Sequence, residues 1–197
     1  MPMIPAFLLI LCVVVYRITT GLFIQSGATW LSNFAPFAAI AFCSAVYFPS
    51  RYKILVPVLA LLISDVVLNF YYNVSMLNPL ILCRYLALTL IGCFGLILQG
   101  RPSMKKLLSA SLLASCTFYL VTNAFSWLTD PGYAKTLAGL VQALTVGLPA
   151  FSSTPTWMFF RNSLVSDLLF TVLFVMCIRF GRGAEHARAG AAAPYLA

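Results

Sequence analysis

Six long apolar runs, each 18 to 24 residues, constrain this chain more than any other feature. A hydrocarbon core of ~30 Å needs about 20 apolar residues in a helix. Only 8% of the residues are charged, which excludes a soluble enzyme, a nucleic-acid binder and a disordered protein. We therefore predict an all-α integral membrane protein with six transmembrane helices. They cover residues 3–24, 28–48, 54–71, 79–98, 107–127 and 157–180.

These six helices are expected to form a single domain, residues 1–180, followed by a flexible cytoplasmic tail, residues 181–197. A long connection, residues 128–156, separates the fifth and sixth runs. It contains a shorter apolar piece, residues 137–148, that ends at Gly147 and Pro149. Because this piece is too short to span a bilayer, we predict a helix that lies on the outer surface and caps the bundle.

The distribution of basic residues predicts the orientation in the membrane. Lys and Arg gather in the cytoplasmic loops of membrane proteins. In a six-span arrangement, eight basic residues share one side: Arg51, Lys53, Arg101, Lys105, Lys106, Arg179, Arg182 and Arg188. The loops around residues 25–29 and 72–78 carry no charge. Both termini are therefore expected in the cytoplasm, with the chain in a bacterial inner membrane.

Five charged residues lie inside the apolar runs, at the middle or outer depth of the predicted bundle: Arg17, Asp65, Arg84, Arg161 and Asp167. A charge at the bilayer centre costs roughly 2.5–3.5 kcal/mol, so each needs a partner or a water-filled cavity. Three arginines against two aspartates leave more donors than a closed set of ion pairs needs. The pattern favours an outward-facing polar pocket, and the alternative is that Arg–Asp pairs only hold the helices together.

Further polar and aromatic residues fall at the same depth. Asp65, Asn69 and Tyr72 lie at i, i+4 and i+7, on one face of the third helix. Asn123 and Trp127 share a face of the fifth. Aromatic residues are frequent at this level, either as an ordinary interfacial belt or as the walls of a site for a flat ligand: Trp30, Phe34, Tyr71, Tyr72, Tyr85, Trp127, Tyr133 and Trp157.

The six cysteines form no CxxC pair and lack a histidine at metal-ligand spacing, so a disulfide framework or a zinc site is not expected. Cys83 alone falls at pocket depth, next to Arg84. A neighbouring guanidinium favours the thiolate, which binds metals. The alternative is that Cys83 is inert packing, as most buried cysteines are.

Two absences argue against an enzyme. The sequence contains no P-loop motif, so no nucleotide site is expected. His186 is the only histidine and falls in the predicted tail, which excludes histidine-based acid–base catalysis in the membrane. We therefore expect a binding or permeating protein.

Four segments carry a resemblance to a known family: NFAPFAA (33–39), LVPVLALLISD (55–65), FYLVTNAFSW (118–127) with YAKTLAG (133–139), and FFRNSLVSD (159–167). Together they resemble the substrate-binding (S) components of energy-coupling-factor (ECF) vitamin transporters, and more narrowly the BtuM type associated with vitamin B12. The resemblance covers about residues 28–175. Some family features differ, since Cys43-Ser44 stands where many relatives have Gly-Gly, and the first run lacks an AxxxA docking motif.

The resemblance implies an S-component-like bundle that takes up cobalamin or a related corrinoid, with Cys83 as a ligand to its cobalt. It implies a partner in an ECF coupling module, although the protein could also act alone. Alternatives are an S component for another small vitamin or a metal chelate, and a membrane enzyme that modifies a cofactor. The candidate substrate-binding residues are Cys83, Arg84, Tyr85, Asp65, Asn69, Tyr72, Asn33, Phe34, Trp127 and Arg161.

Overall fold

The structure, a computed structural model, describes residues 3–24, 34–75, 78–100 and 102–192. Within these ranges every regular element is a helix, which confirms the predicted all-α class. The helices are α1 (Ile4–Ile24), α2 (Phe37–Tyr47), α3 (Ser50–Lys53), α4 (Leu55–Tyr72), α5 (Pro79–Ile97), α6 (Met104–Thr129), α7 (Leu137–Leu144) and α8 (Thr156–Ala192).

Five of the described helices are long and apolar enough to cross a membrane: Ile4–Leu22, Ser50–Tyr72, Pro79–Ile97, Met104–Thr129 and Thr156–Glu185. Many of their large apolar side chains are exposed on the outside of the bundle, among them Leu8 and Leu11 of α1 and Leu82 and Leu86 of α5. Apolar side chains on an outer face are what a bilayer, rather than water, solvates. The protein is a multi-pass membrane protein.

The second predicted span, residues 28–48, differs from the structure over residues 34–48, and residues 28–33 lie outside the described residues. Its described helix, α2, has 11 residues, or about 16 Å at 1.5 Å per residue, which is roughly half of a hydrocarbon core. Pro36 precedes α2 and disfavours helical backbone at Ala35, and both residues are non-helical. Unlike the long helices, α2 is buried along nearly its whole length, from Phe37 to Val46.

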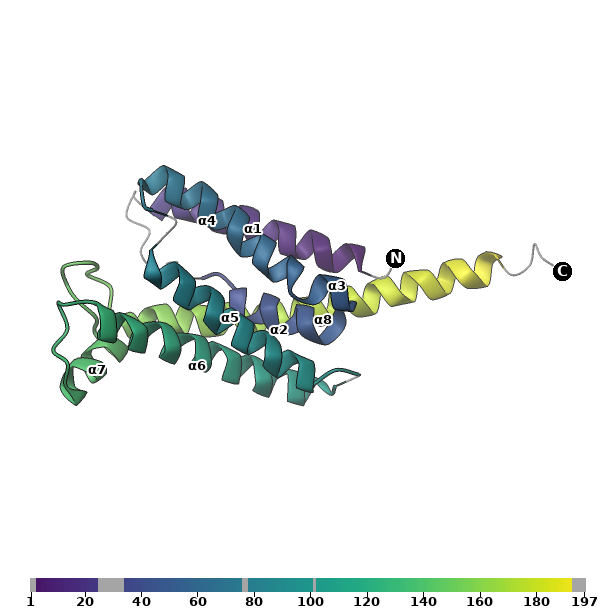
Figure 1. The fold of residues 1–197 in the computed structure, drawn as a ribbon. Coiled ribbons are helices and arrows are strands. Elements are labelled where there is room, and N and C mark those ends of the chain that lie inside the picture. The colour runs from purple at the N-terminus through teal and green to yellow at the C-terminus, as the bar shows by residue number, and fades with distance from the viewer. Residues whose placement is uncertain (1–2, 25–33, 76–77, 101, 193–197) are drawn as a thin grey trace.

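α2 forms the centre of the bundle, packed against α4, α5, α6 and α8. α1 and α4 lie together along one side, with α5 and α6 along the other (Figure 1). The start of α1 and the distal part of α8 lie at one end of the bundle, together with α3, and α7 lies at the opposite end (Figure 1).

Two predicted boundaries differ in the last third of the chain. α8 continues to Ala192, through residues that the sequence predicts as a flexible tail. Alanine and arginine are strong helix formers, and they dominate this stretch. The predicted outer helix is present as α7 but is shorter, Leu137–Leu144, and is followed by Gly147 at φ +74°. A positive φ favours glycine and ends the helical geometry.

α2 begins inside the bundle, and the residues of its first turn are buried. The buried Asp167 carboxylate of α8 accepts a hydrogen bond from the backbone N–H of Ala39 (2.9 Å) in the first turn of α2. Its other oxygen accepts one from Ser115 Oγ of α6 (2.7 Å). An acidic side chain at a helix N-terminus satisfies an orphan donor and complements the helix dipole. Asp167 therefore joins three helices at the point where α2 starts.

We predict that Asp167→Ala destabilises the protein, because it leaves the Ala39 N–H group buried and unpaired, at a cost of about 1–3 kcal/mol. Asp167→Asn should cost less, since the amide oxygen can still accept from Ala39 and the amide N–H₂ can donate to Ser115. Thermal unfolding in detergent measures both changes. The exposed Val165→Ala on the same helix serves as the control. Equal midpoints for Asp167→Ala and Val165→Ala would contradict this role for Asp167.

α2 and α5 are in close contact at Gly95. A Cβ built on Gly95 would lie 2.7 Å from both the Phe42 carbonyl oxygen and Ala45 Cβ, whereas one on Gly92 would meet nothing within 4 Å. Neither contact can relax through a flexible side chain, because one atom is backbone and the other is attached directly to it. This glycine lets the two helices pack at close range.

We expect Gly95→Ala to lower thermal stability by about 1–3 kcal/mol, since it overpacks the α2–α5 contact. Gly92→Ala adds the same methyl group to the same helix and should cause no loss. A comparison of unfolding midpoints in one detergent tests the pair. Similar midpoints for the two variants would show that α2 and α5 do not pack as described.

Candidate functional site

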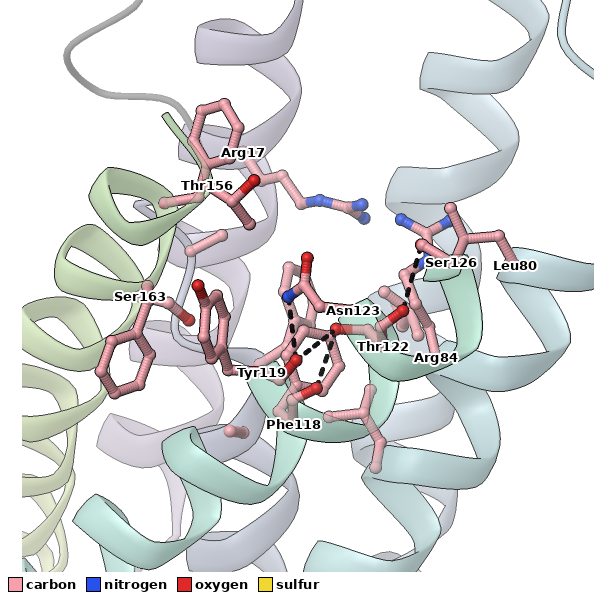
Figure 2. Close-up of a pocket in the computed structure, with 17 residues that line it drawn as sticks. Arg17, Leu80, Arg84, Phe118, Tyr119, Thr122, Asn123, Ser126, Thr156 and Ser163 are labelled. Atoms are coloured by element: carbon pink, nitrogen blue, oxygen red, sulfur yellow. Dashed lines mark hydrogen bonds between the residues drawn. The ribbon is translucent and has the colours of Figure 1, made fainter. Parts of the chain in front are cut away.

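The main candidate site is a cavity of about 290 Å³, shown in Figure 2. It lies toward the end of the bundle that carries α7, where α1 and α6 end and α5 and α8 begin (Figure 1). It is lined from α1, α2 with the residues before it, α4, α5, α6 and α8. The lining residues are Arg17, Ala35, Phe37, Ala38, Leu61, Leu80, Arg84, Leu88, Phe118, Tyr119, Thr122, Asn123, Ser126, Thr156, Phe159, Phe160 and Ser163. We call this the outer cavity.

A cluster of three charges forms one wall of the outer cavity. The Asp65 carboxylate of α4 pairs with Arg17 of α1 through Oδ1 (2.8 Å) and with Arg84 of α5 through Oδ2 (3.3 Å). The Asp65 side chain is 2% exposed, against 16% for Arg17 and 27% for Arg84. The carboxylate therefore lies behind the two guanidinium groups, which extend toward each other across the cavity (Figure 2).

Outside the ion pairs with Asp65, the two arginines have different surroundings. Arg17 donates a hydrogen bond to Ser64 Oγ, and its guanidinium lies 4.6 Å from the ring centre of Phe37, at the start of α2. Within the described part of the chain, Arg84 Nε is buried and has no hydrogen-bond partner. The cluster thus holds one donor that the protein does not satisfy.

The wall formed by α6 carries polar side chains over one turn and a half. Thr122 Oγ1 donates to the Phe118 carbonyl (2.8 Å), Asn123 Nδ2 to Tyr119 (2.8 Å) and Ser126 Oγ to Thr122 (3.1 Å). These donors are used within the helix, as Figure 2 shows. Phe159, Phe160 and Leu88 supply apolar surface nearby. A few polar groups on a largely apolar wall are typical of sites for organic ligands.

Two of the predicted site residues belong to this arrangement. Arg84 lines the outer cavity and Asp65 holds Arg84 in place. The residues that line the cavity from α5 are Leu80, Arg84 and Leu88, spaced by four along the helix. They define the face of α5 that is turned toward the cavity.

The sequence neighbours of Arg84 lie elsewhere. Cys83 is buried against α6, with Sγ 3.9 Å from the Val121 carbonyl oxygen, and is not among the lining residues. Tyr85 lines a second, smaller cavity of about 70 Å³ between α2, α4 and α5. Within the described residues its buried hydroxyl has no hydrogen-bond partner. Adjacent residues of a helix point about 100° apart, so only one of the three can face the outer cavity squarely.

The remaining predicted residues on α1–α4 are structural in this arrangement. Tyr72 donates a hydrogen bond to the Gly21 carbonyl and so joins α4 to α1. Phe34 packs edge-on against Tyr16, with ring centres 6.2 Å apart. Asn69 is not among the residues that line the cavity. Asn33 lies outside the described residues.

Trp127 and Arg161 also lie off the cavity. Trp127 Nε1 donates to the Ala134 carbonyl (2.9 Å) and fastens the loop that leads to α7. The exposed Arg161 lies 5.8 Å from the ring centre of Trp157 and donates to Asn162 Oδ1 (3.1 Å). No residue of α7 lines the cavity, although Tyr119 joins that helix to α6 through the Leu144 carbonyl.

The candidate list from the sequence omits several lining residues. Arg17 is recognisable as an intramembrane charge, and Asn123 and Ser163 as polar residues on helical faces, so these had a signal. Tyr119 and Thr122 had none, because nothing in the sequence distinguishes them from lipid-facing or core residues.

A model for a family of unknown function (DUF6580) matches residues 2–187 of the chain. No curated protein matches significantly, and neither does any solved structure.

We predict that Asp65→Asn destabilises the protein, because it leaves two partly buried guanidinium groups without a counter-charge. Loss of one partner of a buried ion pair lowers the free energy of unfolding by about 3–5 kcal/mol. Because Arg84 is partly exposed, we expect a smaller decrease here. Thermal unfolding measures it. Asp130→Asn in the exposed loop is the matched control and should be neutral. If the two variants unfold at the same temperature, the cluster does not stabilise the fold.

Proposed function

The chain belongs to this family, DUF6580, and we propose that it binds an organic solute in the outer cavity and takes it up across the bacterial inner membrane. The observation that carries the proposal is the Arg17–Asp65–Arg84 cluster on the wall of a membrane-embedded cavity. Ionisable residues inside a membrane are costly and commonly mark a substrate pathway. A cluster that only joined helices would not need to present two guanidinium groups to an open space.

The orientation is part of the proposal. Arg51 and Lys53 of α3 and Lys105 and Lys106 of α6 lie at the end of the bundle opposite to α7 (Figure 1). The positive-inside rule favours the cytoplasm for that end. We infer cytoplasmic termini and six crossings, the second of which includes α2. The outer cavity then faces away from the cytoplasm, where an incoming solute would meet it.

The resemblance to S components suggests cobalamin or a related corrinoid as the solute, with Cys83 as a ligand to cobalt. The aromatic and aliphatic walls of the outer cavity suit a corrin ring, and its amides would pair with polar side chains such as Asn123 and Ser126. Entry of a corrinoid requires the cavity to widen beyond 290 Å³, and ligation requires Cys83 to turn away from Val121. A thiolate is a credible axial ligand for cobalt.

A second candidate is a smaller vitamin or a metal chelate. Two observations favour it: the volume of about 290 Å³, at the lower end of the range for sites of drug-sized ligands, and the position of Cys83 outside the lining. Both candidates keep the fold and the site and describe a transporter rather than an enzyme. In both cases the protein is embedded in the lipid bilayer, and it acts either with an ECF coupling module or alone.

The substrate is tested by purifying the protein from cells grown with cobalamin and recording a visible spectrum. We expect bound corrinoid absorbance, shifted or lost in Cys83→Ala and unchanged in Cys93→Ala. Cys93 is the matched control, since it lies on the same helix but is exposed and borders the smaller cavity. Thiolate ligation should also weaken at low pH, because protons compete with the metal.

Two results would revise the assignment. A colourless preparation without affinity for added cobalamin would exclude a corrinoid and leave the smaller vitamin. Bound cobalamin with identical spectra in the wild type and both variants would show that Cys83 is packing. Product analysis of cobalamin with different upper ligands separates binding from modification.

A further inference from the structure

We propose that the outer cavity recognises its solute through a singly charged oxyanion group, a carboxylate or a phosphodiester, bound between Arg17 and Arg84. This inference rests on the proposed function, because it names the chemical class of the solute at the same site. It starts from the charges of the described residues. Of those that line the cavity, only Arg17 and Arg84 are charged, and both are cationic.

The charge balance favours a monoanion. Asp65 supplies one negative charge against two guanidinium groups, so the cluster carries one positive charge in excess. Asp167 is not part of this cluster: its two oxygens are bonded to the Ala39 N–H group and to Ser115, and it forms no ion pair with either arginine. One anionic group would close the balance, whereas a dianion would leave an excess negative charge in a low-dielectric site.

The geometry supplies donors for such a group. Asp65 engages only Nη2 of each arginine, so other N–H groups of the two guanidinium groups remain for a ligand. Guanidinium groups present several N–H donors in a plane that matches a carboxylate or a phosphate. Phe37 and Ala38, in the first turn of α2, border the same space. The ligand's uncharged part would then lie against Phe118, Phe159 and Leu88.

Two matched probe pairs test the inference on the purified full chain in lipid nanodiscs. Benzoate and benzamide have nearly the same shape and differ in charge. Trimethyl phosphate differs from dimethyl phosphate in charge and by one methyl group. Calorimetric titration should show at least one anion binding about tenfold or more tightly than its neutral partner, which is the scale of a charge-assisted hydrogen bond. The preferred pair distinguishes a carboxylate from a phosphodiester.

Variants locate the effect. Arg84→Gln should abolish the preference for the anion, and Arg84→Lys should keep part of it, because the charge remains while the planar set of donors is lost. Arg161→Gln, which removes an exposed arginine outside the lining, should keep the full preference. The unfolding midpoint of each variant is measured in parallel, so that a loss of binding can be distinguished from a loss of the fold.

Each remaining outcome is decisive. Equal affinity for an anion and its neutral partner overturns the oxyanion inference and leaves the proposed function standing. A preference that survives both Arg84→Gln and Arg17→Gln also overturns it, since the anion then binds elsewhere. Binding of cobalamin without binding of any probe anion has the same consequence. If the wild-type protein binds neither cobalamin nor any probe, the proposed function itself fails.

Discussion

The Asp65 carboxylate is bonded to arginines from two other helices, and the shape of the outer cavity depends on this interaction. Removing three charges from water is costly, and the cost is offset only while each charge keeps its partner. Asp65 therefore fixes α1, α4 and α5 relative to one another at the depth of the cavity. Because the carboxylate lies behind the guanidinium groups, their outer sides remain turned toward the space where a ligand would bind.

A second constraint follows from the short helix α2. A helix that starts inside a membrane bundle exposes N–H groups that lipid cannot satisfy. Asp167 supplies the acceptor from α8, and Ser115 holds the same carboxylate from α6. This arrangement leaves the first turn of α2 free to border the cavity. Discontinuous helices whose N-termini face a binding site are a recurrent device in membrane transporters, which agrees with the uptake function proposed here.

The sequence predicted the long helices well, because a run of about 20 apolar residues has few alternatives in a bilayer. It did not predict the length of α2. Its run is as apolar as the others, and only Pro36 signals the interruption. The continuation of α8 to Ala192 was missed because a polar stretch rich in alanine and glycine suggested a tail, whereas alanine and arginine sustain the helix.

The site was predicted only in part, for a reason that lies in the helices themselves. Depth can be read from the sequence: it placed Asp65 and Arg84 at one level, and in the structure the two side chains pair. The sequence does not show which face of a helix is turned toward the cavity when every face is apolar. Apolar side chains suit both the lipid and the protein core, so the pattern of side chains does not separate the two faces. Cys83 and Tyr85 flank Arg84 in sequence and yet lie against α6 and in the smaller cavity.

The central claim is that the outer cavity opens away from the cytoplasm and holds a solute. The most direct measurement uses a background that keeps the buried Cys83 as its only native cysteine, with Ser126→Cys on the cavity wall, in intact cells treated with a membrane-impermeant maleimide. The account predicts labelling of Ser126→Cys from outside and slower labelling when cobalamin, or an anion that the cavity binds, is present. Ser109→Cys, near the other end of α6, should stay unlabelled. Labelling of Ser109→Cys from outside with none at Ser126→Cys would contradict the account.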